Sequence, residues 1–290
     1  MTDEREIPIR EADSGVTRVS IEKISSAGSI SEQDQVCVEE PLEIRVSFGD
    51  EGEELTLSIT MRTPGDDLDL AVGFLHGEGI VHGREDVTTV EHCGPPSPDK
   101  GFKNVVKVSL GPNASLNPDL LDRHFYTTSS CGVCGKTSLD AVNIKIPEQS
   151  QSNFQISAQA LHKLPSEVRL LQSAFLQTGG CHAAALFEQN GQVKLVREDV
   201  GRHNAVDKVV GANVRSSLSV LNSSGLFLSG RASFELIQKA ALARIPLVCA
   251  VGPPSNLAIE LAEQEQITLV GFLGESRLNV YCHPERVTSA

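Results

Sequence analysis

The chain has 290 residues and a formal net charge of −13, with 40% hydrophobic and 22% charged residues. These values are ordinary for a soluble globular protein of one large domain or two smaller ones. Nucleic-acid binding would require a basic stripe, and none is visible in the sequence. No apolar run approaches the ~20 residues of a membrane span, and the polar N-terminus does not resemble a signal peptide. Seven cysteines, an odd number, favour the reducing cytoplasm over a disulfide scaffold.

The first predicted strands follow a polar N-terminal segment. Residues 1–35 lack a sustained period, and we expect them to form a loosely held extension. From Leu42 to Phe48 every second residue is apolar, and the alternation resumes from Leu55 to Met61 after a turn at residues 49–52. This pattern predicts a half-buried β-hairpin.

A helix and another strand come next. Residues 62–67 predict a turn whose aspartates can cap a helix in which Leu68, Val72 and Leu75 fall at helical spacing. Capping explains these aspartates better than metal binding does. Residues 102–110 then predict a further strand.

The segment TSSCGVCGK places Cys131 and Cys134 three positions apart, between glycines and before Lys136. Glycine lets backbone N–H groups approach a sulfur, and a nearby cation favours the reactive thiolate. The alternative is half of a structural zinc site, which needs four ligands, commonly from two such pairs. Since no second C-x-x-C motif occurs, we favour a reactive or sulfur-carrying pair and expect no structural metal. The other cysteines are scattered singly: Cys37, Cys93, Cys181, Cys249 and Cys282.

A diglycine lies between two helices and a second hairpin. Residues 158–164 and 165–177 predict helical stretches interrupted near the proline, and an Asn-Gly pair at 190–191 predicts a hairpin turn. The intervening glycines permit a ligand to approach the backbone at Gly180 and His182, and they could equally end the helix.

A highly charged run extends from Arg197 to Lys208 and leads into an amphipathic helix. A solvated helix start would explain it. We favour a ligand-facing turn in which Arg202 and the helix N-terminus meet a phosphate. Asp199 or Asp207 would bond a base or ribose, and we assign His203 to the ligand as well.

The last 65 residues alternate between strands and helices, which predicts a parallel sheet covered by helices. Ligands bind beyond the carboxyl ends of such strands. The turns there are residues 229–233, with Ser229 and Arg231, residues 252–255, and the segment after Phe272. Together with the Arg202 turn they indicate a nucleotide-sized anionic ligand, although the chain has neither a P-loop nor a G-x-G-x-x-G motif.

Six segments resemble the formate dehydrogenase accessory sulfurtransferase family, FdhD or NarQ, in the family's order. They are RTPGDDLDLAVGFLHGEGI (62–80), TSSCGVCGK (128–136), TGGCHAAAL (178–186), REDVGRHNAVDKVVG (197–211), SGRASFELIQKA (229–240) and ITLVGF…RLNVYCHPERV (267–287). The resemblance covers the chain from about residue 37 to its C-terminus.

This resemblance implies a function. A cytoplasmic member accepts sulfur from a cysteine desulfurase as a cysteine persulfide and passes it to the molybdenum or tungsten bis-guanine-dinucleotide cofactor of formate dehydrogenase. The persulfide carrier maps onto Cys131, with Cys134 assisting. GDP- or GMP-like nucleotides would bind the same site as the cofactor.

The resemblance also implies sites and a fold. The family's cofactor-binding segment maps onto six consecutive residues: Phe272, Leu273, Gly274, Glu275, Ser276 and Arg277. The expected fold is α/β, with a cytidine-deaminase-like three-layer core that includes the parallel β-α-β part. We expect a flexible extension over 1–35, a smaller α+β domain over 36–125, the deaminase-like domain over 126–290, and a homodimer.

Two other functions remain open. The alternative is a non-catalytic chaperone that binds and delivers the guanylated cofactor. A zinc-dependent hydrolase ranks third, because the zinc deaminase signature H-x-E…P-C-x-x-C fails where His182 is followed by Ala183-Ala184 and where Ser130 precedes Cys131. Cys181 could enter a disulfide or be a second sulfur acceptor.

Overall fold

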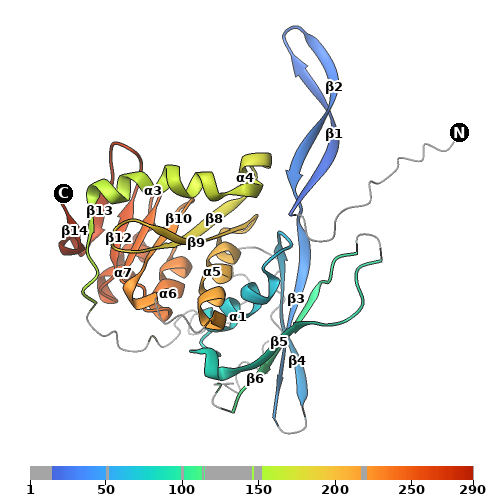
Figure 1. Cartoon of the computed structure of the whole chain (residues 1–290), viewed down its shortest axis with the longest axis horizontal. Coiled ribbons are helices and arrows are strands. Elements are labelled where there is room, and N and C mark those ends of the chain that lie inside the picture. The colour runs from blue at the N-terminus through green and yellow to red at the C-terminus, as the bar shows by residue number, and fades with distance from the viewer. Residues whose placement is uncertain are drawn as a thin grey trace, which may run out of the picture.

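The chain is a mixed α/β protein with a four-stranded sheet in its N-terminal half and a six-stranded sheet in its C-terminal half (Figure 1). This computed structural model describes residues 15–49, 52–98, 101–112, 114, 146, 152–216 and 221–289. Cys131 and Cys134 therefore lie outside the described residues. No helix in the described ranges is long and apolar enough to cross a membrane.

A two-stranded hairpin of β1 (Val16–Ser25) and β2 (Gly28–Cys37) projects from the body (Figure 1). We predicted no strand before residue 36, so this element was missed. The hairpin register places Val19 opposite Asp34 and Ile21 opposite Glu32, which mixes apolar and acidic residues on one face. Most residues of this hairpin are exposed, and no continuous apolar face is buried. The alternation of apolar and polar residues that predicts a strand is therefore weak.

The four-stranded sheet has the order β4-β3-β6-β5. Strands β3 (Glu40–Phe48) and β4 (Glu53–Arg62) are antiparallel, which confirms the predicted hairpin. β6 (Val105–Leu110) confirms the next predicted strand and runs parallel to β3. β5 (Val87–His92) was not predicted and follows a short 3-10 turn, η1 (Arg84–Asp86).

The six-stranded sheet has the order β13-β12-β11-β10-β8-β9. Its central strands β10 (Gly225–Leu228), β11 (Leu247–Ala250) and β12 (Thr268–Gly271) are mutually parallel, as predicted. β8 (His182–Phe187) and β9 (Val193–Asp199) form the predicted second hairpin, and β13 (Asn279–Cys282) is antiparallel to β12.

Helices cover both faces of this sheet (Figure 1). Alternate residues of β8 divide between two apolar clusters, Ala184 with Leu186 on one side and Ala183 with Ala185 on the other. The first cluster includes residues of α5 (Arg202–Ser216), α6 (Phe234–Leu242) and α7 (Asn256–Gln264), and the second those of α3 (Ala158–Leu171). The remaining short elements are α4 (Ser173–Thr178), β7 (Ile156–Ser157), β14 (Val287–Thr288), η3 (Leu221–Ser223) and η4 (Pro284–Arg286).

The predicted interruption near Pro165 is wrong. α3 continues through this proline and ends at Leu171. Leu161, Leu164 and Val168 are all buried in the same cluster at helical spacing. Their packing outweighs the one backbone hydrogen bond that proline removes.

The two sheets are joined where α1 (Asp67–Gly77) crosses α5. A Cβ atom added at Gly73 would overlap the carbonyl oxygen of Asp207, and one added at Gly211 would overlap that of Asp69. The two backbones therefore touch at reciprocal glycines, and apolar residues of both helices share one core.

Candidate functional site

Several predicted ligand residues gather at one edge of the six-stranded sheet. β8 runs antiparallel to β10 and to β9, so the start of β8 and the end of β9 lie at the carboxyl end of β10. His182 begins β8, Asp199 ends β9 directly opposite it, and Ser229 follows β10. We call this edge the rim. The predicted turns thus do meet at the carboxyl ends of the parallel strands.

Backbone hydrogen bonds tie the rim loops to one another. Gly252 N–H donates to Gly230 O at 2.9 Å, and Phe272 N–H donates to Gly252 O at 3.2 Å. A Cβ atom at Gly252 would lie 3.0 Å from Gly230 O, so this position favours glycine. Ser229 is fixed through Ala183, whose N–H donates to the Ser229 Oγ at 2.8 Å. The loops after β10, β11 and β12 therefore form one connected platform.

Arg202 brings an unpaired donor to the rim. Its side chain is partly exposed, yet its Nε is buried and has no hydrogen-bond partner among the described residues. His182 lies nearby, and its pKa is lowered, first by burial and then by the charge of Arg202. A buried guanidinium donor without an acceptor is expected to be satisfied by water or by an anionic ligand.

Asp199, which we expect to bond a base or ribose, lies beneath the surface of the rim, and its contact with a ligand stays a prediction. It is completely buried, with one oxygen 2.8 Å from Lys208 Nζ. Its oxygens also accept hydrogen bonds from Thr63 N, Gly201 N and Asn204 Nδ2. Burial raises the pKa of this carboxyl, and Lys208 counteracts the rise. The role of Asp199 is therefore to hold the turn that presents Arg202.

Asp207 and His203 are also buried beneath the rim. Asp207 Oδ1 accepts a 2.6 Å hydrogen bond from Lys239 Nζ, and burial raises the pKa of Asp207 while Lys239 opposes that effect. His203 Nε2 lies 3.2 Å from Glu235 Oε2 and 3.4 Å from Ser233 Oγ. These contacts join α5 to α6, so both residues support the rim rather than line it.

The predicted segment from Phe272 to Arg277 leaves the rim after β12. Phe272 has φ 51°, a left-handed conformation that is uncommon for a bulky residue and is often found at functional sites. The guanidinium of Arg277 lies 5.4 Å from the centroid of the Phe272 ring. Gly274 O is 2.5 Å from His162 Nδ1 on α3, and Leu273 is buried. Glu275, Ser276 and Arg277 are exposed.

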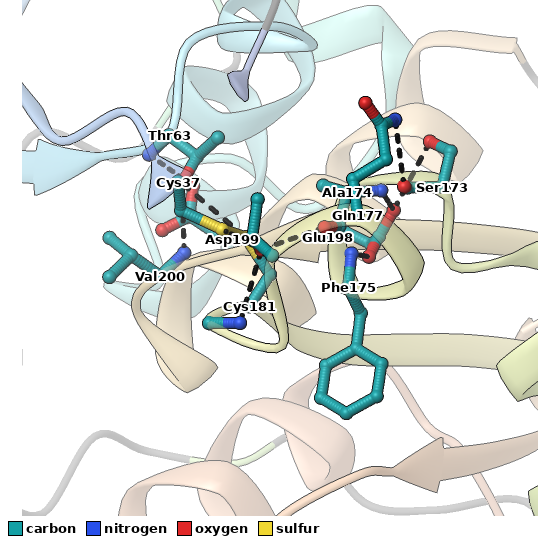
Figure 2. The surroundings of a disulfide bond; sticks show 12 residues. Cys37, Thr63, Ser173, Ala174, Phe175, Gln177, Cys181, Glu198, Asp199 and Val200 are labelled. Atoms are coloured by element: carbon teal, nitrogen blue, oxygen red, sulfur yellow. Dashed lines mark hydrogen bonds between the residues drawn. A yellow bond between two sulfur atoms is a disulfide. The ribbon is translucent and has the colours of Figure 1, made fainter. Parts of the chain in front are cut away.

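A disulfide between Cys37 and Cys181 lies beside the rim (Figure 2). Cys181 immediately precedes His182, whereas Cys37 ends β2. A disulfide is one of the two roles that the sequence permits for Cys181, but the partner Cys37 is 144 positions away and no local pattern identifies it. Gly180, another predicted ligand residue, is exposed and borders this disulfide.

The other described cysteines are poor nucleophiles or lie elsewhere. Burial raises the pKa of Cys249, and it raises that of Cys282 to about 11, so both stay protonated thiols near neutral pH. Cys93 is partly exposed in the N-terminal half. The described ranges contain no cluster of three or more His, Cys, Asp or Glu residues suited to a metal ion.

Comparison with known proteins shows extensive similarity. Residues 37–288 match the FdhD/NarQ family. The sulfur carrier protein FdhD of Mycolicibacterium paratuberculosis is 44% identical over 275 residues, which cover 93% of this chain and 98% of that protein. The protein of the same name from Thermoplasma volcanium is 42% identical over 271 residues, with coverages of 92% and 94%. A crystal structure described as a formate dehydrogenase accessory protein, from Desulfotalea psychrophila, has the same fold, with TM-score 0.73 and 23% identity over 95% of this chain and 100% of that one.

Proposed function

The chain belongs to the FdhD/NarQ family, and on this basis we propose that it is a sulfur-transfer accessory protein for formate dehydrogenase. Relatives that are more than 40% identical over most of both chains carry the name sulfur carrier protein FdhD. The C-x-x-C pair of Cys131 and Cys134 supplies two thiols in a glycine-flanked segment suited to this chemistry.

The proposed carrier is Cys131. Its thiolate attacks the outer sulfur of a cysteine desulfurase persulfide, the S–S bond of that persulfide breaks, and the desulfurase cysteine leaves as a thiolate. The chain then holds a Cys131 persulfide and acts as a sulfurtransferase, with Cys134 assisting. The acceptor is the molybdenum or tungsten bis-guanine-dinucleotide cofactor, which this protein handles as a substrate on its way to the catalytic subunit of formate dehydrogenase.

The observation that carries cofactor binding is the unpaired Nε of Arg202 at the rim. The cofactor bears several phosphates, and an arginine donor beside backbone turns is suited to them. We assign direct contact to the exposed and partly exposed residues Gly180, His182, Arg202, Ser229 and Arg231 of the rim. The adjoining segment from Phe272 to Arg277 contributes its exposed and partly exposed residues, while the buried Leu273 anchors it. Asp199, His203 and Asp207 hold those residues in place. GDP and GMP should occupy the same surface.

The further assignments also follow from family membership. We propose a cytidine-deaminase-like layering for the C-terminal part, with a smaller N-terminal domain, a homodimer, and a cytoplasmic location. Helix-covered faces on both sides of the six-stranded sheet support the layering.

The alternative function is a chaperone that binds and delivers the guanylated cofactor without carrying sulfur. It would use the same rim contacts, because the phosphate-binding role proposed for Arg202 does not require a thiol. Under this alternative, cofactor binding and enzyme maturation would be intact in Cys131→Ala.

The test is intact-protein and peptide mass spectrometry after incubation with a cysteine desulfurase and cysteine. We expect one reducible added sulfur on the peptide that contains residues 131–134, lost in Cys131→Ala and kept in Cys93→Ala. Absence of the added sulfur, with an active desulfurase confirmed in parallel, would favour the chaperone.

A further inference from the structure

We propose that the disulfide of Cys37 and Cys181 is a second sulfur-reactive site, attacked at Cys37 by hydrosulfide or by a small thiolate. The attack leaves Cys37 as a persulfide or a mixed disulfide and releases Cys181 as a thiolate. This site is separate from Cys131 and does not depend on the proposed function.

The two sulfurs differ in access. Cys181 is only 5% exposed, whereas Cys37 is partly exposed at the end of β2. The neighbouring Gly180 is exposed. A Cβ atom at this position would lie 3.4 Å from Cys37 Sγ, so a larger residue would cover the sulfur and glycine leaves it open. A nucleophile from solvent therefore reaches Cys37, and Cys181 is the leaving group.

Hydroxyl groups lie beside both sulfurs (Figure 2 shows Thr63). Thr178 Oγ1 is 2.9 Å from Cys37 Sγ, and Thr63 Oγ1 is 3.9 Å from Cys181 Sγ. Thr63 Oγ1 accepts a hydrogen bond from Val200 N, which leaves its own hydrogen available to a departing Cys181 thiolate. The nearby Asp199 carboxylate is paired with Lys208. The thiolate formed at Cys181 is therefore not placed beside an unpaired negative charge.

The step balances without an added oxidant. Hydrosulfide donates an electron pair to Cys37 Sγ, a new S–S bond forms, and the electron pair of the old S–S bond leaves with Cys181. With a small thiol, the first attack gives a mixed disulfide at Cys37. A second thiolate then attacks the small molecule's sulfur in that mixed disulfide and leaves two protein thiols and one small-molecule disulfide.

Cleavage of the Cys37–Cys181 disulfide would release a covalent link next to the rim. Cys181 is adjacent to His182, and its disulfide ties the start of β8 to the junction of β2 and β3. Cleavage removes this covalent link while the α1–α5 contact continues to join the two sheets. The pair therefore responds to hydrosulfide and thiols one residue from the proposed cofactor surface.

The experiment uses the full chain with Cys131→Ser and Cys134→Ser, so that sulfur on the proposed carrier cannot contribute. Trypsin releases Cys37 in residues 24–45 and Cys181 in residues 170–194, and under non-reducing conditions these peptides should be joined. After brief treatment with sodium hydrosulfide and blocking of free thiols, we expect one added sulfur on 24–45 and a blocked free thiol on 170–194. An unjoined pair before treatment, or added sulfur on 170–194, would overturn the proposal.

A second variant tests the route of attack. Gly180→Val covers Cys37 Sγ, and we expect the rate of cleavage by glutathione to fall by roughly tenfold because disulfide exchange depends on access. Gln177→Val, on the exposed side of α4, is the matched control and should react at the wild-type rate. Equal rates in both variants would contradict attack at Cys37 past Gly180.

Discussion

The ammonium of Lys208 lies 2.8 Å from the carboxylate of Asp199, and neither side chain is more than 1% exposed. Lys208 also donates to Thr63 O at 2.9 Å and to Glu198 O at 3.0 Å. This pair therefore connects α5, the end of β9 and the segment that follows β4. The pair fixes the turn that presents Arg202 and holds the N-terminal half against the rim.

Replacing Lys208 by methionine should lower the free energy of unfolding by about 3 to 5 kcal/mol, because the Asp199 carboxylate is left buried without its cation. Urea denaturation followed by circular dichroism measures this loss. Lys194→Met removes only an exposed pair with Glu188 and should change stability by less than about 1 kcal/mol. Similar losses in the two variants would show that the buried pair has no special role.

His76 makes stability depend on pH. The pKa of this buried histidine falls from 6.5 to about 4, first because burial disfavours the charged ring and then through His82 and Lys239. The unfolded chain therefore binds a proton that the folded chain excludes, and stability falls as the pH drops from 6.5 towards 4. Between pH 7 and pH 5 this histidine should account for about 2 kcal/mol.

The measurement is urea denaturation of wild type and His76→Gln at pH 7 and pH 5. The variant should lose less stability on acidification, by about 2 kcal/mol. His82→Gln, at an exposed position, should keep most of the wild-type dependence, because burial of His76 is the largest cause of its lowered pKa and the charge of His82 is a smaller one. The same pH dependence in His76→Gln and in wild type would mean that His76 does not cause the effect.

Gly73→Ala should strongly destabilise the protein, although the intrinsic helix propensity of alanine is about 1 kcal/mol more favourable than that of glycine. The added methyl group meets the backbone of Asp207 on α5, which cannot yield without separating the two helices. We expect a net loss of at least about 2 kcal/mol in thermal or urea unfolding.

Gly77→Ala, in the same helix, is the control for this change. Its methyl group would meet the Lys239 side chain, with Nζ at 2.5 Å and Cγ at 3.3 Å. This flexible side chain can shift without separating α1 from α5 and can keep its pair with Asp207. We expect a change within about 1 kcal/mol. A loss at Gly77 as large as that at Gly73 would argue against the backbone contact as the cause.

The sequence predicted the elements whose burial is regular. The alternation of Leu42, Ile44 and Val46 matches their complete burial in β3, and the parallel strands were predicted because each is an apolar run between turns. The hairpin of β1 and β2 was missed because it covers little apolar surface. Short-range patterns cannot identify strands that are held by pairing alone.

The candidate site was predictable as a set of turns but not residue by residue. Asp199 was predicted in a ligand-facing turn, yet it ends β9 and pairs with Lys208 of α5, nine positions along the chain. The Cys37–Cys181 pair depends on a contact between residues 144 positions apart. The direction in which a polar side chain points depends on such distant partners, which local spacing does not contain.

Arg202→Ala and Arg231→Ala should each weaken GDP binding by roughly tenfold, because each loses a charge-assisted hydrogen bond to phosphate. Isothermal titration calorimetry with GDP measures the affinity. Arg202→Lys should recover part of it, since the cation is kept and the planar guanidinium is lost. Lys194→Ala is the control, because Lys194 lies near the start of β9, at the far end of that strand from the rim.

The two arginines distinguish binding at the rim from binding elsewhere. Arg202 contributes a buried donor, whereas Arg231 is exposed, so the loss should be at least as large for Arg202. High salt should reduce the Arg231 contribution more, because screening acts most strongly on exposed charges. Unchanged GDP affinity in both alanine variants would show that the nucleotide does not bind at the rim. The Phe272–Arg277 segment would then have to bind the nucleotide without Arg202 and Arg231.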